Sequence, residues 1–330
     1  MTVQLHLPDP REAFDEATAR QAFSDILDLR VSDEAIGTFL IALSERGESS
    51  IEIAAAAQEL RDRMVPINAP ANAIDVCGTG GDGHHSLNVS TAVAIIVAAC
   101  GVPVAKHGNR AASSKAGAAD TLEALGLDMT RAGETAEATL SELGICFLFA
   151  TNHHPAMKRI QPIRKAIGKR TIFNLIGPLA NPARVERQLI GIARPDYVQI
   201  YGQALQSLGT KAAMVVSGEE GLDELSGAGP SRIFNIGSLP IGDSVMPGDA
   251  GLQSAPTSAI HGGDAAYNAA ALRRLLKGQE GPYRDAVLLN AAAALIVAGR
   301  ASNWRDGVEE AAEVLDNGLA NALLDCWIAF

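Results

Sequence analysis

The sequence predicts an α/β fold, with a mostly parallel central sheet flanked by helices and a small all-helical N-terminal domain. From residue 73 onward, short apolar runs alternate with helical patterns, which is typical of a parallel sheet covered on both faces. Residues 12–64 show helical periodicity throughout. The chain has 330 residues, of which 47% are hydrophobic, so it can bury a sizeable core and is not a disordered protein.

The N-terminal region reads as helices from residue 12 to residue 64, because apolar residues recur every three or four positions. Ser49 and Glu52 have the spacing of a capping box, which predicts that a further helix starts there. Pro66 and Pro70 end the helical region.

The α/β region begins with a buried strand, a glycine-rich turn and a helix, and similar units follow it. Strands are predicted at 74–77, 102–105, 145–149 and 212–216, and helices at 90–100, 132–143 and 197–208. The last third is predicted to be helical at 269–276, 286–297 and 309–328, after an irregular segment at 237–263.

One segment interrupts this alternation. Residues 155–167 read as a helix that begins at a proline and ends before Gly168, and an apolar stretch broken by Gly177 and Pro178 follows. We expect this segment to pack on the N-terminal helices. The predicted domains are therefore 1–70, joined by a segment near 155–182, and 71–330.

Charge and cysteine content limit the partners. The net charge is −11, which disfavours binding to nucleic acid but leaves room for a local pocket for a small anion. The four cysteines form no CxxC pair, which is typical of reduced, buried thiols. The sequence shows neither a signal-peptide core nor an apolar stretch of membrane-spanning length. We therefore expect a cytoplasmic protein that binds neither nucleic acid nor membrane.

The strongest motif is the glycine-rich segment at 75–83, DVCGTGGDG, which lies between a predicted strand and a predicted helix. Its glycines allow positive φ angles and close approach of the backbone to a ligand. Exposed N–H groups and the start of the next helix, with Asn88, Ser90 and Thr91, form an anion site. The alternative is an ordinary strand–helix turn, since the segment is neither GxGxxG nor GxxxxGK[ST].

A second cluster, KHGNR at 106–110 with Ser113, Ser114 and Lys115, follows the next strand. Because ligands bind at the carboxyl ends of parallel strands, both clusters are expected to face one cleft. Lys106 and the paired serines suit a phosphate. The alternative is a solvated basic turn.

Asp223 and Glu224 follow the strand at 212–216 and suit Mg²⁺, which prefers oxygen ligands and usually keeps contacts to water and substrate phosphates. Adjacent acids are also common on surfaces, and Glu219 and Glu220 compete for this role. Taken together, the motifs predict a site for a polyphosphorylated small molecule, and no motif for a covalent nucleophile stands out.

Two further groups follow the strand at 145–149, one directly after it and one on the next predicted helix. His153 and His154 are adjacent in sequence, but neighbouring side chains diverge and no third ligand has suitable spacing, so a zinc site is not predicted. Arg164 is either an exposed helix arginine or a partner for a substrate carboxylate.

These motifs, with NHHPAMK at 152–158, RTIFNLIGPLANP at 170–182 and GLDEL at 221–225, resemble the anthranilate phosphoribosyltransferase family, whose fold is related to the nucleoside phosphorylases. The resemblance implies a homodimer that transfers phosphoribose from 5-phosphoribosyl 1-diphosphate to anthranilate with Mg²⁺. For the ribose diphosphate it implies binding by Gly78, Gly80, Gly81, Asp82, Ser86, Asn88, Ser90, Thr91, Lys106, Ser113 and Ser114. For anthranilate it implies Gly78, His107, Asn109, His154, Arg164, Gly177 and Pro178, and for the metal Ser90, Asp223 and Glu224.

The chain departs from the family pattern at a few positions. KAGAAD at 115–120 replaces the more usual KSGSSD, so Ala118 lacks a hydroxyl; Ser86, His84-His85 and Thr151 also differ. We expect these changes to weaken substrate binding modestly. The rivals are a pyrimidine nucleoside phosphorylase and a non-enzymatic relative that binds nucleic acid. The KHGNR and NHHPA segments argue against the first, and the acidic charge argues against the second.

Overall fold

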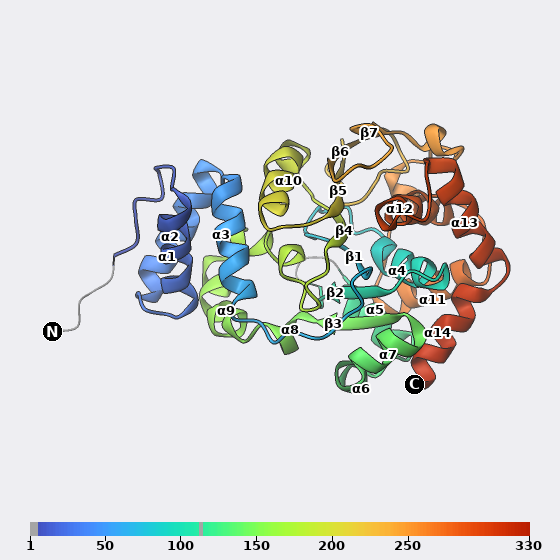
Figure 1. The fold of residues 1–330 in the computed structure, drawn as a ribbon, viewed down its shortest axis with the longest axis horizontal. Helices are drawn as coiled ribbons and strands as arrows, with labels where there is room; N and C mark the ends of the chain where they lie inside the picture. The colour runs from blue at the N-terminus through green and yellow to red at the C-terminus, as the bar shows by residue number, and fades with distance from the viewer. Residues whose placement is uncertain (1–5, 112–114) are drawn as a thin grey trace.

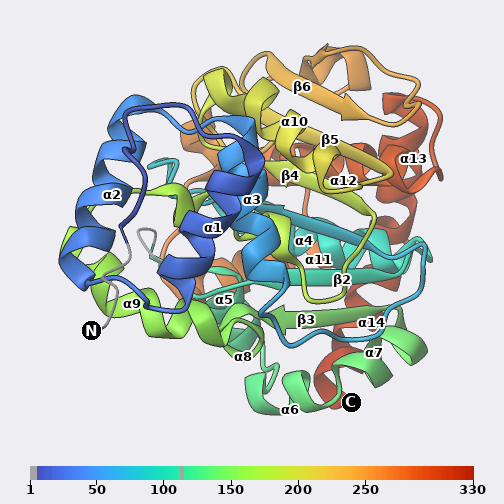
Figure 2. The ribbon, with the colours of Figure 1, turned by 60° about the vertical axis from the view of Figure 1, so that its left-hand side comes forward.

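A seven-stranded sheet forms the centre of the protein (Figures 1 and 2). The computed structural model describes residues 6–111 and 115–330. The strands are β1 (Ile74–Gly78), β2 (Val104–Gly108), β3 (Ile145–Phe149), β4 (Arg187–Gly191), β5 (Ala212–Gly218), β6 (Ser231–Ile236) and β7 (Ser244–Val245). Their order is β3-β2-β1-β4-β5-β6-β7, and the first five in this order run parallel. At one edge, β6 pairs antiparallel with β5, and β7 pairs antiparallel with β6. The prediction of a mostly parallel sheet is confirmed.

Side chains alternate between the two faces of the sheet, as the pleat requires. Met214 and Val216 of β5 join one apolar core, and Ala213 and Val215 join the other. The first core is covered by α4 (Val89–Ala99), α11 (Ala265–Leu276), α12 (Pro282–Ala298), α13 (Trp304–Asp316) and α14 (Leu319–Ala329), with α5 (Ala118–Ala124) beside α11. The second face is covered by α10 (Val198–Ser207), while α6 (Met129–Glu134) and α7 (Ala136–Leu143) pack near β3.

The N-terminal helices α1 (Glu16–Leu27), α2 (Asp33–Arg46) and α3 (Ser50–Arg61) lie to one side of the sheet (Figure 1). The predicted capping box of Ser49 and Glu52 starts α3. Helix α9 (Pro155–Ile167), which follows the short α8 (Ala150–His153), packs against α1 and α2, and α3 packs against α10. The segment that begins with α9 therefore packs on the N-terminal helices, as expected.

Several element predictions differ from the structure. The helix predicted at 132–143 is two helices, because Thr135 has φ −104° and ψ 9°, outside the helical region. The helix predicted at 309–328 is likewise divided at Gly318, whose φ is +73°. Strands β4 and β6 were not predicted, and the segment 237–263 contains β7 and two 3₁₀ turns (Pro247–Ala250 and Thr257–Ile260). Among the described residues, no helix combines the length and the hydropathy needed to span a bilayer.

Candidate active site

Four adjacent parallel strands end in glycine at one edge of the sheet: β2 at Gly108, β1 at Gly78, β4 at Gly191 and β5 at Gly218. The loops that follow β1, β2 and β5 carry Gly80, Gly81, Asp82, Asn109, Asp223 and Glu224. Lys106 and His107 lie within β2 itself. A side chain at Gly191 has no room, since a Cβ there would lie 1.6 Å from the backbone oxygen of Asp223. The segment 219–225, which carries Asp223 and Glu224 and is called the acidic loop below, therefore packs directly against the end of β4.

The glycine-rich loop adopts the backbone conformation that the sequence predicts. Gly80, Gly81 and Gly83 have φ values of +67°, +72° and +79°, which favour glycine. The N–H of Gly80 donates a hydrogen bond to Oδ2 of Asp223 at 2.7 Å. The Gly80 N–H, which the sequence predicts to bind an anion, therefore has a carboxylate of the chain itself as its partner.

The start of α4 repeats this arrangement. The N–H of Ser90 donates to Oε1 of Glu224 at 3.1 Å. The Lys106 ammonium, only 2% exposed, donates to the Val76 carbonyl at 2.7 Å and to the Ser90 hydroxyl at 3.3 Å. Thr91 is buried, and its hydroxyl has no hydrogen-bond partner among the described residues.

Electrostatics favour a cation between these carboxylates. Burial, followed by the nearby Asp82 carboxylate, raises the pKa of Asp223 to about 7. Burial and Asp223 raise the pKa of Glu224 well above its usual value, and Lys106 partly opposes this. Burial lowers the pKa of Lys106, and Asp75 opposes that shift. Clustered acids with raised pKa values are stabilised when a divalent cation neutralises them.

The donor set also fits magnesium. The atoms are carboxylate and hydroxyl oxygens, and Oδ2 of Asp82 is buried without a hydrogen-bond partner among the described residues. Within residues 6–111 and 115–330, no three His, Cys, Asp or Glu residues gather closely enough to hold a metal by themselves. The chain therefore offers part of a coordination shell, which suits an ion that reaches the protein together with substrate phosphates.

The competing acids serve other contacts. Glu219 pairs with Arg232 at 2.7 Å on the surface. Glu220 accepts hydrogen bonds from Ser226 at 2.5 Å and from Thr257 at 3.1 Å. Neither reaches Gly80 or Ser90, so the geometry favours Asp223 and Glu224 for the metal.

Two buried histidines meet beside the end of β2. The Nε2 atoms of His107 and His154 lie 3.2 Å apart, so one ring donates and the other accepts. Burial, with the neighbouring histidines adding to it, lowers the pKa of His107 well below its usual value and that of His154 to about 4. Both rings are therefore neutral near pH 7. A backbone hydrogen bond to Gly177 connects His107 to the next loop.

The remaining residues predicted for the anthranilate site lie on α9, just beyond β2 and in a 3₁₀ turn. Helix α9 begins directly after His154 and carries Arg164, which is half-buried. Burial alone lowers the pKa of Arg164, and no carboxylate pairs with it in the described part of the chain. Asn109 is exposed just beyond β2, and the buried Pro178 begins the 3₁₀ turn Pro178–Ala180. A half-buried guanidinium without an acidic partner suits a carboxylate ligand.

Other predicted positions have mixed outcomes. Ser113 and Ser114 lie outside the described residues. The side-chain oxygen of Asn88 accepts hydrogen bonds from Thr121 at 2.6 Å and from Asn268 at 2.9 Å. This oxygen is therefore occupied by contacts within the protein. Ser86 forms an isolated bridge with His261.

The residues that vary from the family pattern are also placed. The backbone N–H of His84 donates to Asp82 at 3.0 Å, and its ring lies 3.2 Å from the Glu220 carbonyl. Ala118 begins α5, 3.3 Å from where a Cβ on Gly108 would lie. Thr151 is exposed.

Sequence reasoning missed three residues that support these loops. Asn268 of α11 bonds Asn88, Asn290 of α12 bonds the backbone of Leu225, and Arg170 donates to the Gly81 carbonyl at 2.8 Å. Of the three, Asn290 could have been found from the sequence, because it is a polar residue inside an apolar helical run.

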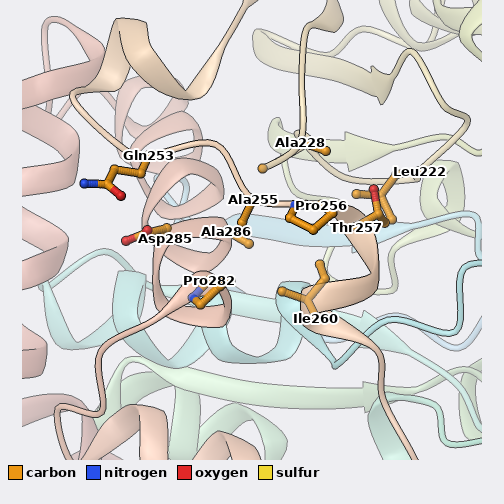
Figure 3. Close-up of a pocket in the computed structure, with 11 residues that line it drawn as sticks. Leu222, Ala228, Gln253, Ala255, Pro256, Thr257, Ile260, Pro282, Asp285 and Ala286 are labelled. Atoms are coloured by element: carbon orange, nitrogen blue, oxygen red, sulfur yellow. The ribbon is translucent and has the colours of Figure 1, made fainter.

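A small cavity lies next to the acidic loop, between Leu222, the 253–260 segment and the start of α12 (Figure 3). Its volume is about 10 Å³, room for about one water and far too small for either predicted substrate.

Known proteins share both the sequence and the fold. The model of a glycosyl transferase family α/β domain matches residues 70–321, and that of the family's helical bundle domain matches residues 10–64. The anthranilate phosphoribosyltransferase of Novosphingobium aromaticivorans is 67% identical over 324 residues, covering 98% of each chain. That of Sphingopyxis alaskensis is 65% identical over 326 residues, again covering 98% of each.

Solved structures agree with this assignment. The anthranilate phosphoribosyltransferase of Thermus thermophilus superposes with a TM-score of 0.90 at 42% identity, covering 98% of this chain and 99% of that one. The Saccharomyces cerevisiae enzyme in complex with PRPP and Mg gives 0.87 at 27% identity, covering 96% and 93%. Its complex with 4-fluoroanthranilate gives 0.85 at 26% identity, covering 96% and 92%. The chain therefore belongs to the anthranilate phosphoribosyltransferase family of glycosyl transferases.

Proposed function

We propose that the loops at the glycine-ended strands are where this chain carries out the reaction of its family. The reaction moves the 5-phosphoribosyl group from 5-phosphoribosyl 1-diphosphate to the amine of anthranilate, giving N-(5-phosphoribosyl)anthranilate and diphosphate. The observation that carries the proposal is the paired contact of Asp223 with the Gly80 N–H and of Glu224 with the Ser90 N–H. It joins the metal-binding acids to the two anion-binding segments.

The diphosphate end is the glycine-rich loop and the start of α4. Breaking the bond between C1 and oxygen leaves negative charge on the diphosphate, and oriented N–H groups at Gly80, Gly81 and Ser90 stabilise that charge. Magnesium held by Asp223, Glu224 and the Ser90 hydroxyl supplies further charge neutralisation. Lys106 donates to the Ser90 hydroxyl, which supports a role for its positive charge beside the same phosphate.

We assign the remaining phosphoribosyl-diphosphate contacts by the family resemblance. They are Gly78, Asp82, Ser86, Asn88, Thr91, Ser113 and Ser114, with Asn88 contributing its amide nitrogen because its side-chain oxygen is taken.

The anthranilate end is the region of the two histidines. Arg164 binds the carboxylate of anthranilate, for which a planar guanidinium is well shaped. His107 and His154 are neutral and line the ring with Asn109, Gly78, Gly177 and Pro178. Because an aromatic amine is weakly basic, it needs little deprotonation, and orientation contributes more than a general base.

We further propose that residues 1–70, joined by the segment near 155–182, form one domain, and that the rest of 71–330 forms the other. Arg164 belongs to the first and the glycine-rich loop to the second, so closure of the domains brings acceptor and donor together and excludes water.

From the family resemblance we also propose a homodimer. The four free cysteines support a cytoplasmic location.

Release of diphosphate tests the function. The purified chain is incubated with 5-phosphoribosyl 1-diphosphate and Mg²⁺, with and without anthranilate, and the product is identified by mass. Release that requires anthranilate supports the proposal. Turnover of a pyrimidine nucleoside with phosphate, and none of anthranilate, would instead favour the phosphorylase; a gel shift of single-stranded DNA alone would favour the nucleic-acid binder.

A further inference from the structure

Helix α12 carries one polar side chain in the middle of its buried run. From residue 286 to residue 297 every position is apolar except Asn290, which is 0% exposed. An asparagine is a weaker helix former than leucine or alanine, and burying its amide is costly unless the amide is hydrogen-bonded. The position therefore calls for a specific partner.

That partner is the backbone of the acidic loop. Oδ1 of Asn290 accepts from the N–H of Leu225 at 2.9 Å, and Nδ2 donates to the Leu225 carbonyl at 3.0 Å. Nδ2 also donates to the Ala286 carbonyl at 2.9 Å. Because Leu225 offers one donor and one acceptor, only one orientation of the amide satisfies both groups.

Leu225 directly follows Glu224, so its backbone determines where the Glu224 carboxylate can reach. On the other side of the loop, the N–H of Gly218 lies within hydrogen-bond distance of the Glu224 carbonyl, at 3.1 Å, and of the Leu222 carbonyl, at 3.0 Å. The acidic loop is thus held by the end of β5 on one side and by α12 on the other.

We propose that Asn290 is a positioning residue for the metal-binding carboxylate of Glu224. This inference rests on the proposed role of Asp223 and Glu224 in holding magnesium. Asn290 touches neither substrate nor metal; it acts by fixing the backbone from which Glu224 extends toward Ser90. Residues that orient metal ligands typically alter metal affinity about 10- to 100-fold when they are replaced.

Metal binding, measured apart from activity, tests the proposal. The full chain is titrated with Mn²⁺ in the presence of inorganic diphosphate, and free Mn²⁺ is followed by electron paramagnetic resonance. Asn290→Leu keeps the number and branching of the side-chain heavy atoms and removes all three hydrogen bonds. We expect its Mn²⁺ dissociation constant to rise by about 10- to 100-fold. Asn290→Ser, a smaller and still polar change, is expected to show the same direction if Asn290→Leu does not fold.

The control is Leu289→Ala, a buried neighbour on the same helix. It should lower the urea midpoint of unfolding and leave Mn²⁺ binding within about twofold, since it removes packing only. If the Asn290 variants are destabilised but bind Mn²⁺ like the wild type, Asn290 merely satisfies the backbone and the proposal is wrong.

Glu224→Gln separates this result from the proposed function. If it also leaves Mn²⁺ binding unchanged, the assigned metal site is wrong. If it weakens binding while the Asn290 variants do not, only the role of Asn290 fails.

Discussion

Oδ2 of Asp223 accepts a hydrogen bond of 2.7 Å from the N–H of Gly80, so a residue assigned to the metal contacts a donor assigned to the phosphate. Glu224 does the same with the N–H of Ser90 at 3.1 Å. In this structure, carboxylate oxygens therefore occupy positions suited to the oxygens of a diphosphate. With the roles proposed above, we expect substrate binding to move these carboxylates from the amides to the metal.

This relationship predicts the behaviour of diphosphate in the absence of metal. Asp223→Ala frees the Gly80 N–H and removes a negative charge, whereas Asp223→Asn removes the charge and can keep the hydrogen bond. The bond kept in Asp223→Asn joins two neutral groups and contributes about 0.5–1.5 kcal/mol, so metal-free diphosphate should bind Asp223→Ala up to about tenfold more tightly than Asp223→Asn. Calorimetric titration in EDTA measures both; equal affinities would show that only charge matters.

Arg164 is predicted to act on one substrate only. Arg164→Ala should raise KM for anthranilate by about 10- to 100-fold, because a charge-assisted, bidentate contact with the carboxylate is lost. KM for the ribose diphosphate should change by less than about twofold, since the mutation removes no contact to that substrate. Steady-state kinetics with each substrate varied in turn measures this.

The matched control for Arg164 is Arg159→Ala on the same helix, where the side chain bonds the Leu27 carbonyl at 3.1 Å, away from the site. It should leave both constants unchanged. Equal increases in both constants for Arg164→Ala would remove its role as the carboxylate partner.

Gly191 is predicted to tolerate no side chain. A Cβ would lie 1.6 Å from the Asp223 backbone oxygen, so Gly191→Ala must displace the acidic loop. Overpacking of this kind costs about 1–3 kcal/mol or more, and the midpoint of the Mg²⁺ dependence should also rise. Gly248→Ala, with open space around the new methyl group, is the control. A wild-type urea midpoint for Gly191→Ala would contradict the packing described here.

Because His107 and His154 are buried with lowered pKa values, the free energy of unfolding is predicted to decrease as the pH falls. The pKa of His154 is lowered from 6.5 to about 4 in the folded state, so the unfolded chain takes up this proton first as pH falls. Its contribution to stability is complete above pH 6.5 and is lost progressively down to about pH 4, by up to about 1.4 kcal/mol per pH unit.

Urea unfolding between pH 4 and pH 8 measures this slope. His154→Gln should make it shallower, though not flat, because the pKa of His107 is also lowered. His6→Gln, at an exposed position, should leave it unchanged. An unaltered slope in His154→Gln would mean that this ring is already protonated, or exposed, in the folded protein.

Local patterns predicted much of this molecule. The capping box at Ser49 and the strand at 145–149 have the predicted positions, because each depends on neighbours in sequence. Strand β4 escaped prediction, since it begins with the polar Arg187 and Gln188 and its place is defined by pairing with β1 and β5. The helix break at Thr135 was missed although Gly133, a weak helix former, lies two residues before it.

The candidate site divides in the same way. The glycines, the acids and the basic cluster indicated the ligand chemistry in the sequence. The residues that hold the loops in place come from distant helices. Asn268 and Asn290 reach the loops across 180 and 65 positions of sequence, which no local pattern records. The choice of Asp223 and Glu224 over Glu219 and Glu220 likewise required the contacts of the folded chain.

The most direct test of the central claim follows anthranilate fluorescence after 5-phosphoribosyl 1-diphosphate and Mg²⁺ are added, beside a no-metal sample and the double variant Asp223→Asn with Glu224→Gln. We predict a loss of fluorescence that requires both additions, and an altered Mg²⁺ dependence in the double variant. Undiminished fluorescence with folded wild-type protein would contradict the assignment of anthranilate as the acceptor. A double variant with an unchanged Mg²⁺ profile would contradict the assigned metal site.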